Sequence, residues 1–403
     1  MTAPPLEAGR DVAAEAPAID YLARVAALAP LITASIDEIE RDRRLPPPLL
    51  DAMLEAGLFR LLVPRPLDGG EIDPVGYVRV IEAVAQLDAS TAWCLCQTAV
   101  CGMVGAYLAP EAAWEIFGRD PRAVLAWGAG PGGRATSVEG GYRVTGTWPF
   151  ASGGHHATWL GGHCLVLKPD GTPELAASGT PVVRTMLFPA AAVAITDNWN
   201  VIGLKGTGSD TYSVKDAFVP AAHSLGRDDP ADRRRNTPLY HLRTDNMFSA
   251  GFASLALGVA RGMIEALIAL AKEKSPRGLK HTMRESATVQ SEIAELEARL
   301  RATRHYLLGT LAEVWDAVVR TSRFTVEQRM AIRLASSRTI HESRDVTNAC
   351  YHAAGATAIF TGNPFERRLR DMNAIAQQLQ GRRAHYETVG KFLLGIETDA
   401  AFL

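Results

Sequence analysis

Two short segments of this sequence combine glycines, hydroxyl groups and aromatic side chains in a way that could hold a ligand. The first, 148–154, reads WPFASGG, and the second, 203–210, reads GLKGTGSD, with three glycines in six residues. Glycines let backbone amides come close to a ligand, and Ser and Thr hydroxyls add hydrogen-bonding groups. Together the two segments predict a flat aromatic cofactor held against the end of a strand. The structural alternatives are an edge strand packed on a neighbour and a β-bulged loop.

Other signatures of catalysis are missing. The sequence contains no Gly-x-Gly-x-x-Gly after a strand, no phosphate-binding Gly-x-x-x-x-Gly-Lys-Ser/Thr, no His-Glu-x-x-His and no Gly-x-Ser-x-Gly. His155, His156, His163 and Cys164 are close in sequence, but their spacing fits no zinc pattern. We interpret them as histidines with satisfied partners at a strand edge, and we expect no metal. The basic run 233–235, beside three aspartates, is interpreted as a solvated linker.

The composition is that of an ordinary soluble globular protein of two or three domains. The 403 residues include 42 Lys+Arg and 44 Asp+Glu, a net charge of −2, so no overall charge favours nucleic acid or an anionic membrane. Five cysteines without a Cys-x-x-Cys pair favour a reducing cytoplasm. The first seventeen residues are expected to be an Ala/Pro tail rather than a signal peptide. The uncharged stretch 89–110 contains polar residues, so we expect a buried helix near a ligand pocket rather than a membrane span.

Three regions with different patterns of apolar residues follow one another along the chain. Apolar residues recur at helical spacing from about 18 to 118, and short apolar runs broken by Gly and Pro follow from Pro121. Strands are predicted at 142–148, 158–168, 182–188, 193–197 and 212–219, which suggests a sandwich or barrel. After a polar linker, helices are predicted at 246–273, 326–350 and 371–395. A heptad-like seam identifies a further helix: Val289, Ile293, Leu296, Leu300, Leu307, Leu311 and Val314.

These regions predict an α+β fold that is mainly α. An N-terminal helical domain (18–120) precedes a central β domain (121–225), and a C-terminal four-helix bundle (240–403) ends the chain.

This order of domains resembles the acyl-CoA dehydrogenase fold. Four sequence motifs resemble one branch of that family in more detail, the oxygenase components of two-component (group D) flavin-dependent monooxygenases. The motifs are 88–93 (DASTAW), 140–153 (GGYRVTGTWPFASG), 199–209 (WNVIGLKGTGS) and 354–371, which runs from AGA through NPFER to RD. The resemblance covers nearly the whole chain, from about Tyr21 to Gly395.

The choice of branch depends on one segment. Acyl-CoA dehydrogenases usually remove a substrate proton with a Glu shortly after the Arg-Asp motif, and the corresponding segment 377–381 here reads QQLQG. Glutamine cannot act as a general base near neutral pH, so dehydrogenation by that route is disfavoured. A dehydrogenase or oxidase that uses another base, such as Glu387, stays an alternative, as does a non-catalytic protein on the same fold.

The resemblance implies that a separate NAD(P)H-flavin reductase supplies reduced FMN or FAD. Through a flavin C4a-hydroperoxide formed with O2, the enzyme would hydroxylate an aromatic, polycyclic or nitrogen-containing small molecule. It places Trp148 and Phe150 in a wall that excludes water, and the Ser152 hydroxyl near flavin N5. The segment Trp127, Gly128 and Ala129 would line the ribityl chain with backbone donors, and Arg277 would contact the cofactor phosphates. Gly355 and Arg370 belong to the segment that would meet the flavin of a neighbouring subunit in a homotetramer.

The sequence departs from the phenol hydroxylases of this branch at two positions. Gln378 stands where several of them have a His, and a second His expected after the DASTAW motif is replaced by Gln97 and Cys101 in that region. We therefore expect hydrogen bonding to a substrate that needs no deprotonation. The candidate catalytic residues are Ser152, Gln378, Gln97 and Trp93 of the DASTAW motif. No nucleic acid or membrane partner is expected, and the protein is expected in the cytoplasm.

Overall fold

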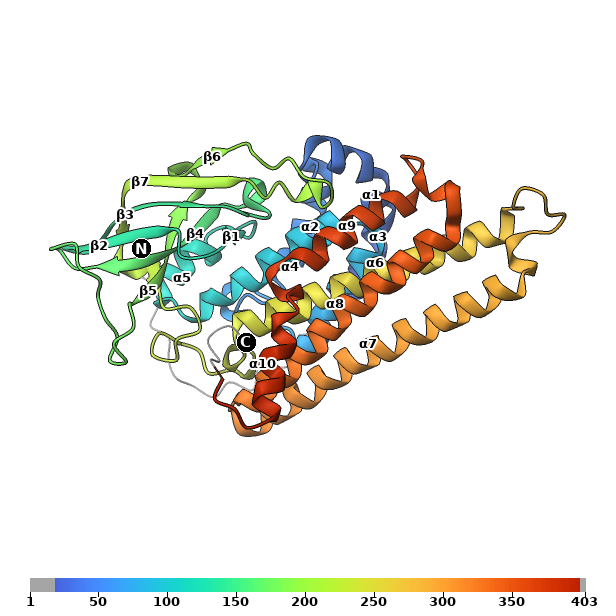
Figure 1. Ribbon diagram of the computed structural model, residues 1–403. Coiled ribbons are helices and arrows are strands. Elements are labelled where there is room, and N and C mark those ends of the chain that lie inside the picture. Colours follow the sequence, from blue (N-terminus) through green and yellow to red (C-terminus); the bar gives the residue numbers. More distant parts are fainter. Residues whose placement is uncertain (1–18, 399–403) are drawn as a thin grey trace.

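This computed structural model describes residues 19–398, and the predicted N-terminal tail lies outside that range. Helices form the first part of the chain (Figure 1): α1 (Tyr21–Asp42), α2 (Pro47–Glu55), α3 (Pro74–Leu87), α4 (Ala89–Gly102) and the short α5 (Pro110–Ala113). Asp20, Asp73 and Asp88 each stand just before a helix and accept a hydrogen bond from a backbone N–H of its first turn. These N-caps explain where α1, α3 and α4 begin.

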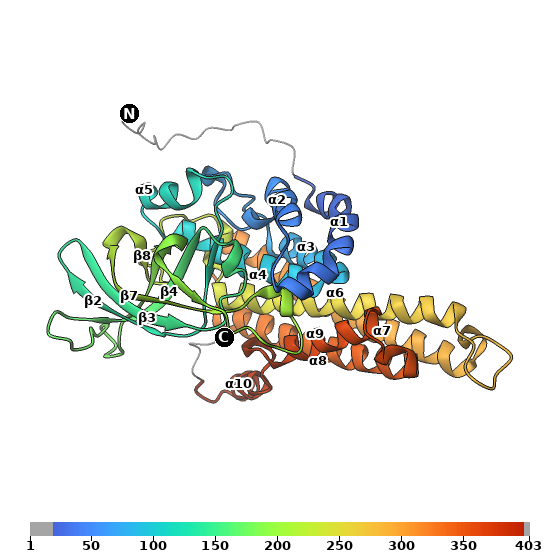
Figure 2. The same cartoon turned by 90° about the horizontal axis from the view of Figure 1, so that it is seen from above.

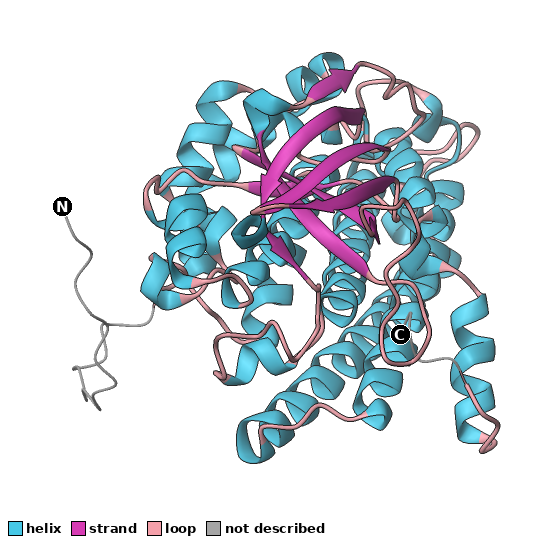
Figure 3. Cartoon of the chain, turned by 90° about the vertical axis from the view of Figure 1, so that its left-hand side faces the viewer, coloured by secondary structure: helices cyan, strands magenta, loops and turns pink. Residues whose placement is uncertain are grey.

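The central part is one mixed sheet (Figure 3). This sheet carries its own apolar core. Its strands are β1 (Leu125–Trp127), β2 (Gly133–Val138), β3 (Gly141–Trp148), β4 (Trp159–Leu167), β5 (Val183–Pro189), β6 (Ala194–Thr196), β7 (Thr211–Pro220) and β8 (Ser224–Leu225). The order is β6-β7-β3-β2-β4-β5-β8, with β1 parallel to β4 and β2 also parallel to β4. The five predicted strands are confirmed, and β1, β2 and β8 were not predicted because each is short or rich in small and polar residues.

The last part is a bundle of long helices, namely α6 (Thr244–Glu273), α7 (Ala287–Thr321), α8 (Val326–Ala354), α9 (Pro364–Gln377) and α10 (Ala384–Leu393). The predicted seam is confirmed on α7, where Leu296, Leu300, Leu307, Leu311 and Val314 are buried. The prediction of one helix over 371–395 is wrong. Gln378 adopts an extended conformation and its side chain caps Gln380 N, so a 3₁₀ turn at 379–381 separates α9 from α10.

The sheet and the α6–α7 loop lie at opposite ends of the molecule (Figures 1 and 2). Helix α6 runs along the length of the bundle between these ends. It is the one helix within residues 19–398 that is long and apolar enough to cross a membrane, and 67% of its most apolar window is buried inside the fold. That burial is typical of the core helix of a globular protein.

Candidate functional site

The two segments that suggested a ligand site lie side by side at the end of the sheet nearest the helices. The loop after β3 (149–156) and the loop before β7 (197–210) are joined by backbone hydrogen bonds: Ala151 N donates to Asp210 O at 3.0 Å and Gly153 N to Thr207 O at 3.2 Å. Helix α4 lies against both loops, because the Trp93 indole donates to Ser152 and the Cys94 thiol donates to Thr207 O. The structure therefore brings together the motifs around residues 93, 152 and 207.

The buried Ser152 hydroxyl is the centre of a chain of hydrogen bonds. Trp93 Nε1 donates to Ser152 Oγ at 2.9 Å, and Ser152 Oγ lies 2.6 Å from Ser209 Oγ. Ser209 Oγ lies 2.7 Å from Thr207 Oγ1, which donates to Leu204 O at 2.8 Å. Two of the predicted catalytic residues, Trp93 and Ser152, are thus in direct contact. Ser209 and Thr207 lay in a motif that the sequence singled out, but no role was predicted for them.

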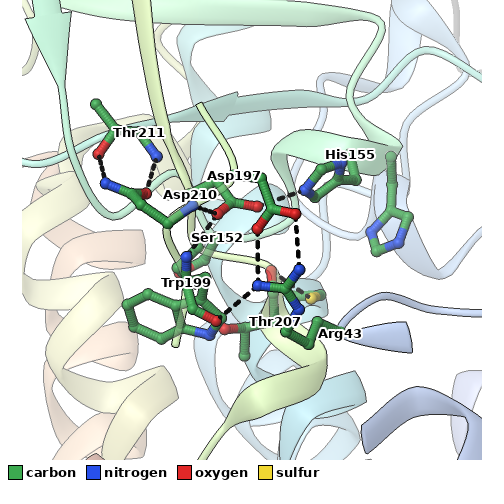
Figure 4. A network of polar contacts seen from close by, with 12 residues as sticks. Arg43, Ser152, His155, Asp197, Trp199, Thr207, Asp210 and Thr211 are labelled. Atoms are coloured by element: carbon green, nitrogen blue, oxygen red, sulfur yellow. Dashed lines mark hydrogen bonds and ion pairs between the residues drawn. The ribbon is translucent and has the colours of Figure 1, made fainter. Parts of the chain in front are cut away.

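A second polar network holds the 197–210 loop in shape (Figure 4). The Asp210 carboxylate accepts the backbone N–H groups of Asn198 and Trp199, both at 2.7 Å, and pairs with His155 Nε2 at 2.7 Å. Arg43, just after α1, donates to Trp199 O at 3.1 Å and pairs with Asp197. Arg43 and His155, from two other parts of the chain, thus join Asp197 and Asp210 of the loop in fixing the backbone on which Thr207 and Ser209 stand.

A row of aromatic rings lies beside Ser152. Trp93 lies tilted against Phe252 with ring centroids 4.2 Å apart, Phe252 stacks on Phe248 at 6.0 Å, and Phe248 meets Trp127 edge-on at 6.1 Å. The four rings come from α4, α6 and β1, so three separate elements build an apolar wall. Sequence reasoning missed Phe248 and Phe252, because nothing in the apolar pattern of α6 distinguishes them from core residues.

Phe150 is the exposed aromatic residue of the first loop. Its side chain is 58% exposed and meets Trp199 edge-on at 5.9 Å. Its backbone has φ +62°, a left-handed conformation that costs a non-glycine residue roughly 1 kcal/mol or more. An exposed aromatic ring in a strained backbone conformation fits a residue that contacts a ligand or another chain.

Trp148 does not belong to this surface, and the prediction that it forms part of a water-excluding wall is wrong. The indole is fully buried inside the sheet core, where it stacks on Tyr212 at 5.2 Å and donates to His163 O at 3.0 Å. Alternation along β3 explains the outcome, because Val144, Gly146 and Trp148 share the inward face of the strand. A side chain with no exposed surface cannot contact a cofactor.

The predicted backbone donors at the end of β1 are also engaged elsewhere. Gly128 N donates to the Tyr212 hydroxyl at 3.2 Å and Ala129 N donates to Pro149 O at 2.9 Å. These amides therefore hold the β1–β2 loop against the sheet and cannot donate to a ribityl chain as predicted. Trp127 itself lies in the aromatic wall, and the Arg227 guanidinium stands 5.9 Å from its ring centre.

The two glutamines that replace histidines have different environments. Gln97 lies one helical turn after Trp93 on α4, and its Nε2 is 3.7 Å from Cys101 Sγ. Gln378 accepts from Gln380 N at 2.7 Å through Oε1, while its buried Nε2 has no hydrogen-bond partner within residues 19–398. A buried donor without a partner costs free energy unless a ligand or water satisfies it, so Gln378 fits a residue that donates to a bound molecule.

Arg370 and Asp371 hold the glycine-rich loop onto α9. Arg370 donates to Ile202 O at 2.6 Å and pairs with Glu366 and Glu40, and the hydrogen bonds with Glu366 raise its pKa. Asp371 accepts Leu204 N–H at 2.6 Å, and burial raises the pKa of this carboxyl to about 7. Gly203 permits this approach, because a Cβ there would collide with the Arg370 carbonyl. Within one chain Arg370 positions the loop, and its predicted contact with a cofactor stays a prediction.

Arg277 and Gly355 lie at the opposite end of the molecule. Arg277 stands on the α6–α7 loop, which is far from the sheet in both views (Figures 1 and 2). Gly355, at the end of α8, lies near the same loop, since Lys274 Nζ donates to Ala354 O at 2.7 Å. The two residues cannot meet Ser152 inside one chain. The predicted cofactor residues therefore fall into a sheet-end group around Ser152 and a distal group that contains Arg277 and Gly355.

The three clustered histidines have internal partners. His156 Nε2 accepts from Leu45 N at 3.0 Å, and burial lowers the pKa of this imidazole to about 4. His163 Nδ1 lies 2.8 Å from Thr185 Oγ1, and burial lowers its pKa well below the usual value. His155 pairs with Asp210, as described above. All three therefore serve as structural residues of the β domain.

The residues at the sheet end fit a flat ring system with a polar edge. The aromatic wall offers apolar faces and Ser152 offers a buried hydroxyl. The Gln378 amide, at the turn between α9 and α10, offers a donor that lacks a partner among the described residues. Apolar faces with a few polar groups suit a flavin ring, whose edge carries nitrogen and oxygen atoms.

Comparison with known proteins places these features in context. Residues 23–112 match the family model "Acyl-CoA dehydrogenase, N-terminal domain" and residues 250–381 match "Acyl-CoA dehydrogenase, C-terminal domain". The chain is 29% identical to the flavin-dependent monooxygenase oxygenase subunit HsaA of Rhodococcus jostii (strain RHA1), over 87% of this chain and 92% of that protein. It is also 29% identical to the oxygenase component of the FADH2-dependent resorcinol hydroxylase of Rhizobium sp. (strain MTP-10005), over 96% and 97% respectively.

A solved structure agrees with these sequence matches. The crystal structure of 3-HSA hydroxylase from Rhodococcus sp. RHA1 superposes with a TM-score of 0.86 at 26% identity, covering 94% of this chain and 98% of that one. The similarity therefore extends over all three parts of the fold.

Proposed function

This chain belongs to the acyl-CoA dehydrogenase family, and we propose that it is the oxygenase component of a two-component flavin-dependent monooxygenase. It uses reduced FMN or FAD and O2 to hydroxylate an aromatic, polycyclic or nitrogen-containing small molecule. The relatives named as oxygenase subunits and components support this assignment over nearly the full length of the chain.

The observation that carries the proposal is the lack of a usable base near the end of α9. Segment 377–381 contains no carboxylate, and the nearest alternative, Glu387, has a side chain that is 66% exposed and paired with Lys391 at 2.6 Å. An exposed, ion-paired carboxylate is poorly suited to removing a proton from a buried substrate carbon. The family's usual dehydrogenation is therefore disfavoured in this chain.

The side chains at the sheet end have distinct tasks in this proposal. A bound reduced flavin would supply the electrons that activate O2. Trp93, Phe252 and Phe248 would keep water from the reacting centre. Ser152 and the Gln378 amide hydrogen-bond to the polar edge of the ring or to the substrate. Phe150 covers the open side of the ring.

The substrate is one that needs no proton removed before it reacts. Gln97 and Gln378 are neutral at all physiological pH values, so they bind by hydrogen bonding and cannot deprotonate a phenol. The resorcinol hydroxylase among the relatives makes resorcinol a useful reference compound. We expect a larger aromatic or a nitrogen heterocycle to react better than a simple phenol.

The complete cofactor site takes residues from two copies of the chain. Trp93 and Ser152 belong to the sheet-end group, whereas Arg277 and Gly355 belong to the distal group. A flavin that touches both groups lies between subunits, as in the homotetramer expected from the sequence. A separate reductase and a cytoplasmic location complete the proposal, the latter consistent with five free, buried cysteines.

The test combines the purified chain with an NADH-dependent flavin reductase, NADH and either FMN or FAD under ¹⁸O2. We expect one labelled oxygen atom in an aromatic substrate, none when this chain is omitted, and an unchanged rate in Glu387→Gln. A tightly bound oxidised flavin that acyl thioesters reduce in the absence of oxygen would show the dehydrogenase activity instead.

A further inference from the structure

The hydroxyl chain at Ser152 has a direction that its geometry fixes. Thr207 Oγ1 lies 2.8 Å from Leu204 O, and a carbonyl oxygen can only accept, so the Thr207 proton lies between these two atoms. If that proton pointed elsewhere, two oxygen atoms would face each other at this distance without a hydrogen between them. The hydrogen bond from Thr207 to Leu204 O therefore determines which atom donates in each of the other hydrogen bonds.

Each earlier proton follows from this one. Since Thr207 has given its proton to Leu204 O, Ser209 must donate in the 2.7 Å contact between Ser209 Oγ and Thr207 Oγ1. Ser209 then has no proton left, so Ser152 must donate in the 2.6 Å contact with Ser209. At the other side Trp93 Nε1, which can only donate, gives its hydrogen to Ser152 Oγ at 2.9 Å.

Ser152 is left with one free lone pair and no free proton. A hydroxyl has one donor and two acceptor positions; Ser209 takes the donor position and Trp93 takes one acceptor position. Ser152 can therefore accept one more hydrogen bond but cannot donate one. Burial of Ser152, Ser209 and Thr207 at 5%, 3% and 1% exposure keeps water from reorienting the chain.

We infer that Trp93, Ser209 and Thr207 are positioning residues that make Ser152 a hydrogen-bond acceptor, and that this selects reduced over oxidised flavin. Reduction turns N5 of the flavin ring from an acceptor into an N–H donor, so only the reduced ring offers the hydrogen that Ser152 needs. The inference rests on the proposed function, which places Ser152 against the flavin edge. An oxygenase that receives reduced flavin from a reductase and releases oxidised flavin needs this preference.

The test measures flavin binding rather than turnover. Dissociation constants are determined for oxidised flavin in air and for reduced flavin without oxygen, and their ratio is compared among variants. Ser209→Ala frees the Ser152 proton, so we expect the preference for reduced flavin to fall by about tenfold, the value of one hydrogen bond. For a two-electron couple that change equals about 30 mV in the midpoint potential of the bound flavin.

Two variants of Thr207 separate the effect of hydrogen-bond direction from the effect of side-chain packing. Thr207→Ser keeps the hydroxyl and should keep the preference, whereas Thr207→Val keeps the shape and should lose it to the same extent as Ser209→Ala. Ser254→Ala, a buried serine whose hydroxyl donates to Gly251 O of its own helix, is the control and should retain the wild-type ratio. Thermal melting identifies folded variants, and the Thr207 pair alone decides the question if Ser209→Ala does not fold.

Equal binding ratios in wild type, Thr207→Val and Thr207→Ser would overturn the inference while leaving the proposed function intact, provided that wild type binds reduced flavin and incorporates labelled oxygen. Failure of the wild-type protein to bind reduced flavin would overturn the proposed function and this inference with it.

Discussion

At the scale of single residues, Trp148 and Phe150 are two positions apart and have opposite roles. Trp148 is fully buried, so we expect Trp148→Ala to lower the free energy of unfolding by about 3–5 kcal/mol. Phe150 is 58% exposed, so Phe150→Ala should change stability by only about 0.5 kcal/mol while weakening reduced-flavin binding. Urea unfolding and anaerobic flavin titration measure the two effects.

Phe150→Gly is the control for the left-handed backbone at this position. Glycine adopts φ +62° without strain, so Phe150→Gly should be more stable than Phe150→Ala by about 1 kcal/mol and bind flavin equally weakly. Equal stability of the two variants would show that the backbone at residue 150 is relaxed.

His156 makes the stability of the β domain depend on pH. Its Nε2 accepts Leu45 N–H and must be unprotonated to do so, and burial lowers its pKa from 6.5 to about 4. The unfolded chain then binds more protons between these pH values, so stability falls as pH decreases from 6.5 to 4, by roughly 3 kcal/mol. His156→Gln should flatten this part of the stability profile.

The control for this titration is the exposed His305 on α7. His305→Gln should keep the wild-type slope between pH 6.5 and 4 in urea unfolding. A His156→Gln profile that parallels the wild type would assign the acid sensitivity to other groups.

The residue types of the site could be predicted from the sequence, but their contacts could not. Ser152 and Trp93 stood in recognisable motifs, yet 58 residues separate them and only the packing of α4 on the sheet brings them together. Trp148 was placed wrongly because a motif gives identity without strand direction, and alternation along β3 turns that indole inward. Phe248 and Phe252 carried no signal because core and ligand-facing positions of a buried helix have the same composition.

At the scale of elements, α9 couples the glycine-rich loop to the bundle through a carboxyl that titrates near neutral pH. Burial raises the Asp371 pKa from 3.8 to about 7, so the folded state binds more protons than the unfolded chain between these values. The stability that this group contributes is present at low pH and lost as pH rises through 7. Asp371→Asn can still accept Leu204 N–H and should be more stable than wild type at pH 8 by roughly 2 kcal/mol.

The difference between the Asn variant and wild type should shrink toward pH 4.5, as measured by urea unfolding at several pH values. The exposed Asp316→Asn on α7 serves as the control and should show no such pH-dependent gain. If Asp371→Asn were less stable than wild type at pH 8, the charged carboxylate rather than its acceptor oxygen would hold the loop.

Long periodic elements were predictable, and a local interruption was not. The seam of α7 spans more than six turns, so its apolar period outweighs any single residue. The break between α9 and α10 depends on the Gln378 side chain, which caps a 3₁₀ turn, and on Gly381, where a Cβ would stand 2.6 Å from Ala376 O. Neither feature alters the hydrophobic pattern, so the sequence predicted one continuous helix.

At the scale of the whole molecule, the predicted cofactor residues lie at the two ends of an elongated chain. The sheet end carries Trp93 and Ser152, and the distal end carries the α6–α7 loop with Arg277 (Figure 2). The long helices that separate these ends are rigid and well packed, so no bending within one chain brings the two groups together. A single flavin can contact both groups only if two copies of the chain lie in opposite directions.

This arrangement predicts that two inactive variants restore each other. Ser152→Ala damages the sheet end and Arg277→Glu damages the distal loop, so each pure oligomer should bind reduced flavin weakly. When both variants are unfolded and refolded together in equal amounts, about a quarter of the sites receive an intact sheet end from one chain and an intact loop from another. Roughly a quarter of the wild-type capacity for tight flavin binding should therefore return.

Mixing the two variants without refolding is the control, because subunits that do not exchange cannot complement each other. If the refolded mixture binds no more flavin than the separate variants, the two groups do not complete one site between chains.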